Sequence, residues 1–303
     1  MKLFILAGVA SLSCAALAAA CSSSSNKGSG GGGGDGGSSS GGDGGGDAKS
    51  GDGGSSSGGT TYSGALAAAE ATAGVFDIAG SFVATPDASA TANMCPGSGV
   101  MSGSCCYEPP APASDAGAAD AGTVAVFSAG TITIKDGTST LANMSPGTNG
   151  AYGITSGAMN PTVKWTPGDT LAVSAAGATV DAFTGNLVTV VDLAGITPAL
   201  SLKTATNVPL ATALVVSWTA GTATTVRVTL LAAKGTAGDG LISCSVDDSA
   251  GTVTVPTALL SKLTTGDNGV LSLTRQSVNM ATGANVSVQL LSSTTATGIV
   301  KFQ

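Results

Sequence analysis

Histidine is absent from this 303-residue chain, and glutamate occurs only at Glu70 and Glu108. The chain therefore lacks the commonest general base, the Ser-His and Cys-His nucleophile pairs, and imidazole metal ligands. Charged residues make up only 10% of the sequence, and its 11 Lys and Arg residues form no cluster. Nucleic-acid binding is not expected, because it depends on neutralising phosphates with basic side chains.

Nucleotide-binding and nucleophile motifs are missing as well. No phosphate-binding Gly-x-x-x-x-Gly-Lys occurs, and in Gly153–Gly157 the serine stands one place away from a Gly-x-Ser-x-Gly elbow. Long helical periodicity is also absent, and the best helical candidate is the short Thr257–Leu263. We expect no cofactor and no enzymatic activity, with carboxylate chemistry as the one catalytic alternative.

The first 20 residues read as a signal peptide. Lys2 precedes an apolar run from Leu3 to Leu17, and three alanines follow. A permanent transmembrane helix is the alternative. Cleavage is favoured because Ser22–Ser25 follow at once, without stop-transfer charges.

The end of this leader, Leu17-Ala18-Ala19-Ala20-Cys21, resembles the signal box of bacterial lipoproteins, with Leu17 one residue further from the cysteine than is commonest. The resemblance implies that Cys21 becomes the acylated N-terminus. Several acyl chains hold firmly, since each buried methylene contributes about 0.8 kcal/mol and one chain alone binds only marginally. A secreted protein cut after Ala-x-Ala, with Cys21 unmodified, is the alternative.

Residues 21–59 are nearly all Gly and Ser after the cysteine. Such a segment cannot bury enough apolar surface to offset its ordering entropy, so we expect a disordered tether. Its r.m.s. reach would be roughly 35 Å and its extended reach about 130 Å. The tether would carry the remaining residues, 60–303, away from a membrane surface.

Residues 60–303 consist of short runs rich in Thr, Val and Ala, separated by turn residues. Thr225–Leu230 alternates polar and apolar side chains, as a half-buried antiparallel strand requires. Similar alternation recurs at Thr131–Lys135, Leu214–Trp218, Thr252–Val255 and Asn285–Leu290. We predict an all-β antiparallel β-sandwich, with room for seven strands after about Ile196. The pattern resembles immunoglobulin-like or fibronectin-type sandwiches, a resemblance that carries no activity.

A weak internal sequence repeat is consistent with two packed β domains, 60–195 and 196–303, divided near Gly195. Val163–Gly168 and Val216–Gly221 each contain a Trp followed by a Thr-x-Gly turn, although coincidence explains this similarity equally well. We expect Trp165 and Trp218 to anchor cores, because each shares a face with apolar neighbours. A sugar-stacking platform is the alternative.

Four cysteines besides Cys21 follow the leader: Cys95, Cys105, Cys106 and Cys244. An even number in an exported protein predicts two disulfides, and a bond between the adjacent pair would be strained. Cys95 is therefore expected to pair with one of the adjacent cysteines and Cys244 with the other. A four-thiolate zinc site is the alternative, but no Cys-x-x-Cys pair is present, so we expect no metal.

Asp239, Asp247 and Asp248 lie around the expected strand Leu241–Val246. Asp247–Gly251 is typical of an exposed hairpin turn, because Asp and Gly favour turn conformations. A surface cation site and a catalytic carboxylate pair are the alternatives.

Leader, acylatable cysteine, tether and β domain together resemble uncharacterised tethered surface lipoproteins of Gram-negative soil bacteria. Cys95–Gly99 and Ser104–Tyr107 add to this resemblance. It implies a lipid-anchored protein of the cell envelope, at the outer membrane, facing the periplasm or the surface. We expect a non-catalytic structural, adhesion or binding role, with the membrane and polysaccharide or another envelope protein as partners. An envelope-glycan hydrolase using Asp residues is the rival hypothesis, and a lipoprotein with a pocket for a small ligand is a third.

Overall fold

The computed structural model describes residues 60–72, 75–84, 95, 99–110, 125–155, 163–233 and 240–303. The leader, Cys21, the predicted tether and Asp239 lie outside these residues. Strands dominate the described chain, so the predicted all-β class is confirmed. Most strand pairs are antiparallel, whereas β1 and β10 each pair with β16 in parallel.

The strands of the N-terminal part have the following bounds: β1 Tyr62–Thr72, β2 Val75–Ala84, β3 Val100–Ser102, β4 Cys105–Glu108, β5 Ile132–Asp136, β6 Ser139–Met144, β7 Tyr152–Thr155, β8 Thr170–Ala175 and β9 Phe183–Val188. The elements that follow are β10 Thr206–Val208, β11 Leu214–Ser217, β12 Thr225–Ala233, β13 Gly240–Asp247, the 3-10 helix η1 Asp248–Ala250, β14 Thr252–Val255, α2 Thr257–Leu260, β15 Asn268–Thr282 and β16 Val286–Phe302. Seven strands thus follow Ile196, as the alternation predicts.

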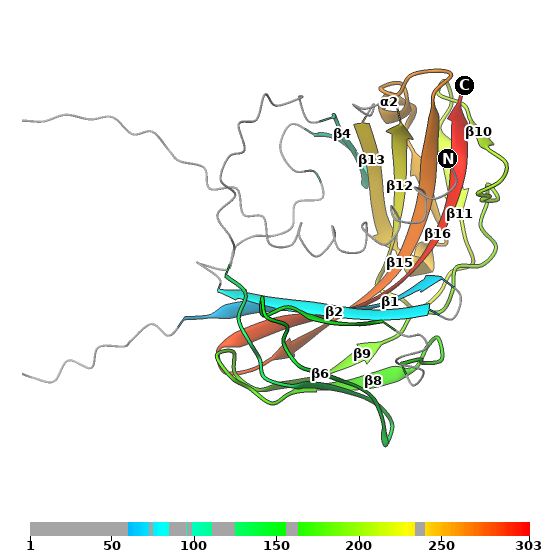
Figure 1. Ribbon diagram of the computed structural model, residues 1–303. Helices are drawn as coiled ribbons and strands as arrows, with labels where there is room; N and C mark the ends of the chain where they lie inside the picture. Colours follow the sequence, from blue (N-terminus) through cyan, green and yellow to red (C-terminus); the bar gives the residue numbers. More distant parts are fainter. Residues whose placement is uncertain are drawn as a thin grey trace, which may run out of the picture.

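Two hydrophobic cores divide the molecule into two lobes (Figure 1). The first lobe contains β1, β2 and β5–β9, and the second contains β3, β4, β10–β14 and α2. Gly195 lies in the connection between β9 and β10. Residues before it also reach the second core, because Cys105 on β4 packs there.

The hairpin of β15 and β16 belongs to both lobes. Its strands are 15 and 17 residues long and curve from one lobe into the other (Figure 1). At about 3.4 Å per residue, each strand reaches roughly 50 Å or more. Leu271 and Leu273 fill the second core, whereas Ala281 and Leu290 fill the first. One continuous ladder therefore connects the two sandwiches.

Between the two cores, the side chains on the inward face of this hairpin change from apolar to polar. Arg275, Ser277 and Ser292 are buried there, although Leu273 on one side of this stretch and Ala281 and Leu290 on the other belong to the two cores. Period-two alternation explains why the side chain of Arg275 points inward, since Leu271 and Leu273 lie on the same face. We call this polar stretch of the hairpin the waist.

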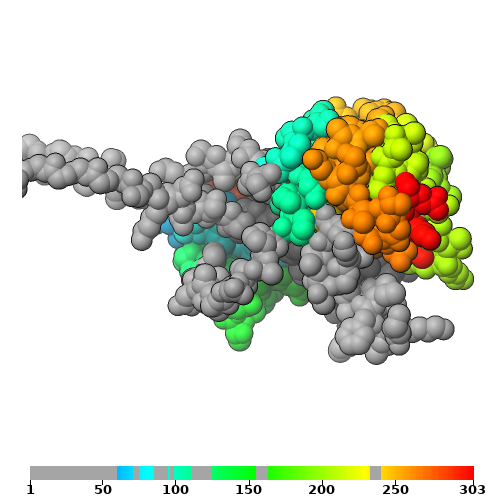
Figure 2. Space-filling view, turned by 90° about the horizontal axis from the view of Figure 1, so that it is seen from above, coloured from blue at the N-terminus to red at the C-terminus, as the bar shows by residue number. Residues whose placement is uncertain are grey.

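Two disulfides attach β4 to its surroundings. Cys105 bonds to Cys244, its partner in the β4–β13 register, and Cys106 bonds to Cys95. Successive residues of a strand point to opposite sides, so the adjacent cysteines reach different partners. The disulfides expected from the cysteine count are present. Figure 2 shows the β3–β4 segment on the surface of the second lobe, where β3 contacts α2.

Candidate functional site

Among the described residues, a polar sheet face lies exposed on the outside of the first lobe. β6, β5, β8 and β9 are neighbours in antiparallel register, so their outward side chains form rows across the sheet. We call this surface the polar face and define it by its two rows, Asn143-Thr133-Ser174-Thr184 and Lys135-Ala172-Asn186.

The local sequence explains why these side chains face outward. Ile132 and Ile134 on β5, and Leu171 and Val173 on β8, are almost completely buried in the first core. Because side chains alternate along a strand, the polar residues between them must face solvent. The same alternation that builds the core therefore builds the polar face.

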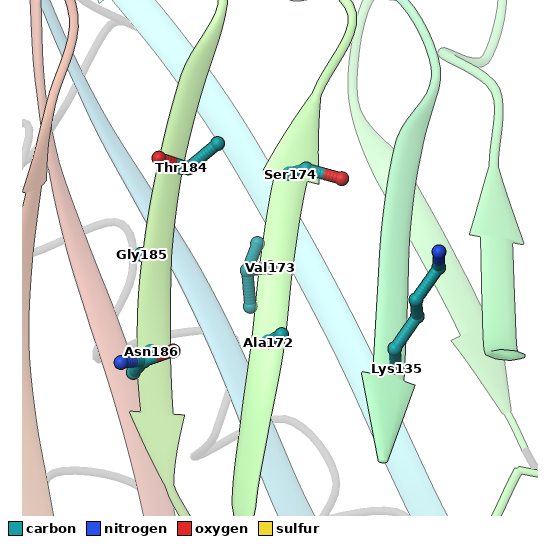
Figure 3. A pocket seen from close by; sticks show the side chains of 7 residues that line it. All are labelled: Lys135, Ala172, Val173, Ser174, Thr184, Gly185 and Asn186. Carbon is teal, nitrogen blue, oxygen red and sulfur yellow. The ribbon is translucent and has the colours of Figure 1, made fainter. Parts of the chain in front are cut away.

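A shallow depression of about 380 Å³ lies on the polar face. Figure 3 shows the residues that line it, with Lys135 on β5, its side chain running along that strand, and Thr184 and Asn186 on β9. Ala172 leaves a low centre between these longer side chains. Gly185 also lines the depression through its backbone, since a Cβ built there would point inward and lie 2.7 Å from Ala281 Cβ in the core.

The chemistry of this depression is that of neutral hydrogen bonding. Hydroxyl and amide groups both donate and accept, and Lys135 adds one cation. Thr133 Oγ1 donates to Asn143 Oδ1 at 2.8 Å in the adjoining row. The lining residues that the structure describes supply no carboxylate, thiol or imidazole. The arrangement is suited to hold a hydroxyl-rich ligand.

A second polar cluster is buried at the waist. The carboxylate of Asp248 is fully buried and accepts from three groups: Trp218 Nε1 at 3.1 Å, Arg275 Nε at 3.1 Å and the Ala223 amide at 3.0 Å. Arg275 NH2 forms the ion pair with Asp248 Oδ1 at 2.9 Å. We call Asp248, Arg275 and Trp218 the waist cluster.

The waist cluster corrects one prediction. Asp247–Gly251 does turn the chain between β13 and β14, with Gly251 at φ 64°, but the predicted hairpin is wrong, because β14 pairs with β11 and not with β13. Asp247 is exposed, but Asp248 is buried, so the expectation of a fully exposed turn is wrong. The physical reason is Arg275, whose charge compensates the desolvated carboxylate.

Both tryptophans are core residues, as predicted. Trp165 is 8% exposed and packs edge-on against Phe76 at a centroid distance of 4.5 Å in the first core. Trp218 is 5% exposed in the second core. Neither indole ring presents a free face for stacking on a sugar.

The described residues provide neither a metal site nor a membrane-spanning helix. Among the residues that the structure describes, no three His, Cys, Asp or Glu side chains are grouped so that they could hold a metal ion. No helix in the described part of the chain combines the length and the apolar character needed to cross a bilayer.

Sequence reasoning missed Arg275 and the polar face, although both carry a signal. Arg275 continues the inward series of Leu271 and Leu273, which predicts a buried cation in need of a partner. The polar face required knowing that β5, β8 and β9 are neighbours. That neighbourhood is set by pairing between distant segments and not by any local pattern.

Comparison with known proteins yields no family. No family model matches the chain, and no curated protein matches it. Similar solved structures include the FN1–FN3 domains of chicken CNTN1, with 8% identity, a TM-score of 0.25, and coverage of 80% of this chain and 64% of that one.

Two further structures come from adhesion proteins. One is a tetra-tandem repeat in the extending region of a large adhesion protein, with 13% identity, a TM-score of 0.20, and coverage of 79% of this chain and 49% of that one. The other is a 1.5-MDa bacterial ice-binding adhesin, with 12% identity, a TM-score of 0.20, and coverage of 80% and 65%. The chain therefore spans less than two thirds of each of these structures, and its fold class rests on its own strands and their pairing.

Proposed function

We propose that this chain is a lipid-anchored protein of the cell envelope with a non-catalytic binding role. Cys21 carries the anchor, residues 22–59 form the tether, and the two-lobed β structure is the head. The polar face is its contact surface for neutral polysaccharide. The observation that carries this proposal is the register of β6, β5, β8 and β9, which aligns hydroxyl and amide side chains in rows.

Neutral polysaccharide suits the polar face because both partners are rich in hydrogen-bond donors and acceptors and poor in charge. Lys135 is the only charged side chain that lines the depression. Adjacent strands lie about 4.8 Å apart, so a row offers a polar group at each such step. An extended chain of hydroxyl-rich units could therefore be contacted at several points along one row.

The buried carboxylate at the waist argues against its use in glycan hydrolysis. Asp248 Oδ1 accepts from Trp218 and Arg275, and Oδ2 accepts from Ala223. A general acid must give and take a proton at an oxygen that the substrate can reach. Asp248 instead acts as a structural acceptor.

Affinity electrophoresis of the full-length protein in detergent tests the proposal. We expect retardation in gels that contain dextran, a neutral glucan, and little retardation with polygalacturonate. Changing both Thr133 and Thr184 to Val removes two hydroxyls at constant shape. Binding should weaken by about tenfold or more, since each lost hydrogen bond costs about 1 kcal/mol.

Thr254→Val is the matched control, because Thr254 is exposed on β14 in the second lobe. It should bind as the wild type does. Equal dextran binding by all three proteins would overturn the assignment to the polar face. Release of reducing ends from dextran by the wild type would support the rival hydrolase hypothesis.

A further inference from the structure

The waist cluster lies where the two lobes meet. On the inward face of β15, Arg275 comes directly after Leu273 of the second core, and Ala281 of the first core follows further along. At this point of the hairpin Arg275 and Ser277 interrupt the apolar inward series, and the indole of Trp218, from the second core, donates to Asp248. The contacts of Arg275 therefore decide what holds the lobes together here.

Arg275 reaches three backbone carbonyl oxygens, on two separate segments, and the Asp248 carboxylate. Its NH1 group donates to the carbonyl oxygens of Val191 at 3.0 Å and Asp192 at 3.1 Å, in the connection from β9 to β10. Its NH2 group donates to the Thr219 carbonyl oxygen at 2.6 Å, in the loop that follows β11. A guanidinium group has five N–H donors in a rigid fork, and Arg275 makes four hydrogen bonds with them, besides the ion pair with Asp248.

The connection between the lobes is also held by the hairpin itself. The Val190 amide donates to Ser292 Oγ at 3.3 Å, and Thr294 Oγ1 donates to Asp192 Oδ1 at 3.1 Å. Both bonds join the connection to β16. Directional bonds from both strands of the waist thus converge on residues 190–192.

Apolar packing does not replace these bonds. A cavity of about 370 Å³ adjoins the cluster and is lined by both the β9–β10 connection and the loop after β11. Gly221 passes directly over the ion pair, since a Cβ there would lie 2.5 Å from Asp248 Oδ2. Because an open space remains here between the described residues, the hydrogen bonds of the waist contribute to the geometry of the junction.

We propose that the waist cluster is a conformational lock that holds the two lobes at a fixed mutual angle. A buried ion pair adds little net stability over apolar residues of similar volume, but its directional bonds specify one arrangement. When the lock is removed, the hairpin continues to connect the lobes, and the β9–β10 connection detaches from the waist. The head then hinges about β15 and β16.

Hydrogen–deuterium exchange of the full-length protein tests the lock. The double variant Arg275→Met with Asp248→Leu replaces the ion pair by apolar side chains of similar size. Exchange at Ala223 should rise by about tenfold or more, because its amide loses the Asp248 carboxylate. Exchange at residues 189–194 should rise similarly, because the carbonyl groups of Val191 and Asp192 lose the guanidinium group that fixes this segment. Exchange in β8 and β12, within the two cores, should stay unchanged.

Arg275→Lys is a second variant, which keeps the charge but cannot reach all the partners of the guanidinium group. It should raise exchange at the same sites to a smaller extent. If the double variant does not fold, Arg275→Lys provides the test in its place. The matched controls are Arg227→Met and Asp247→Asn, because both of these charged side chains are exposed.

Unchanged exchange at residues 189–194 in Arg275→Lys and the double variant would overturn the proposal. A uniform rise through both cores would overturn it as well, because the cluster would then contribute only to global stability. The two controls should exchange at the same rates as the wild type. Faster exchange at residues 189–194 in either control would contradict the assignment of the lock to Arg275 and Asp248.

Discussion

At the scale of single residues, glycines show most directly how the two cores are filled. Gly185 lies on β9, and the space where a side chain would stand is occupied by Ala281 and Leu290 of the hairpin. Gly153 lies on β7 and faces open space. Neither residue is recorded with a positive φ, so the two positions differ in packing and not in backbone strain.

We therefore predict that Gly185→Ala lowers the free energy of unfolding by about 1–3 kcal/mol, because the added methyl group overpacks the first core. Gly153→Ala, the control, should change it by less than about 0.5 kcal/mol. Urea denaturation measures both. Equal effects of the two substitutions would show that β9 is not packed closely on the hairpin.

The indole of Trp218 carries a second prediction at this scale. Trp218→Phe removes the donor to Asp248, whereas Trp165→Phe removes similar volume in the other core. The loss in the free energy of unfolding should be about 1–3 kcal/mol larger for Trp218→Phe, because a buried carboxylate loses a partner. Thermal unfolding of both variants provides the comparison, and equal losses would mean that packing alone matters.

At the scale of elements, short strands were the predictable part of the fold. Thr252–Val255 forms β14 with the expected bounds, and Thr225–Leu230 forms most of β12. Each alternates over its whole length, so local sequence specifies which face is buried. The expected helix after Pro256 is shorter, since α2 ends at Leu260.

The hairpin shows where local pattern fails. Alternation predicts a strand over Asn285–Leu290, yet β16 continues to Phe302 through a run of Ser and Thr that reads as a loop. This run remains extended because β15 pairs along the full length and β1 pairs in parallel along part of it. Tertiary pairing overrides the weak local signal.

The two disulfides provide a prediction at the element scale. Removing Cys105–Cys244, which spans 139 residues, should cost more than removing Cys95–Cys106, which spans 11. The loop entropies correspond to about 5 and about 3 kcal/mol. Urea denaturation of the two Cys→Ser double variants measures the difference. A larger loss from the short bridge would contradict the assigned pairing.

At the scale of the whole molecule, two sandwiches share one hairpin and are joined at a polar waist. Local alternation predicts the β class, and the cysteine count predicts two disulfides. The polar face and the waist cluster depend on which distant segments pair, and a single sequence does not encode that pairing in any local pattern. The anchor and tether remain predictions from the leader and the Gly/Ser segment.

The most direct test of the account is metabolic labelling with a fatty acid, followed by detergent phase separation and intact-mass analysis without reductant. The wild type should carry acyl chains, enter the detergent phase and have no free thiol in residues 60–303. Cys21→Ser should lose both the label and the detergent partition and keep both disulfides. Label retained in Cys21→Ser, or wild-type protein found in the aqueous phase, would contradict a lipid-anchored head.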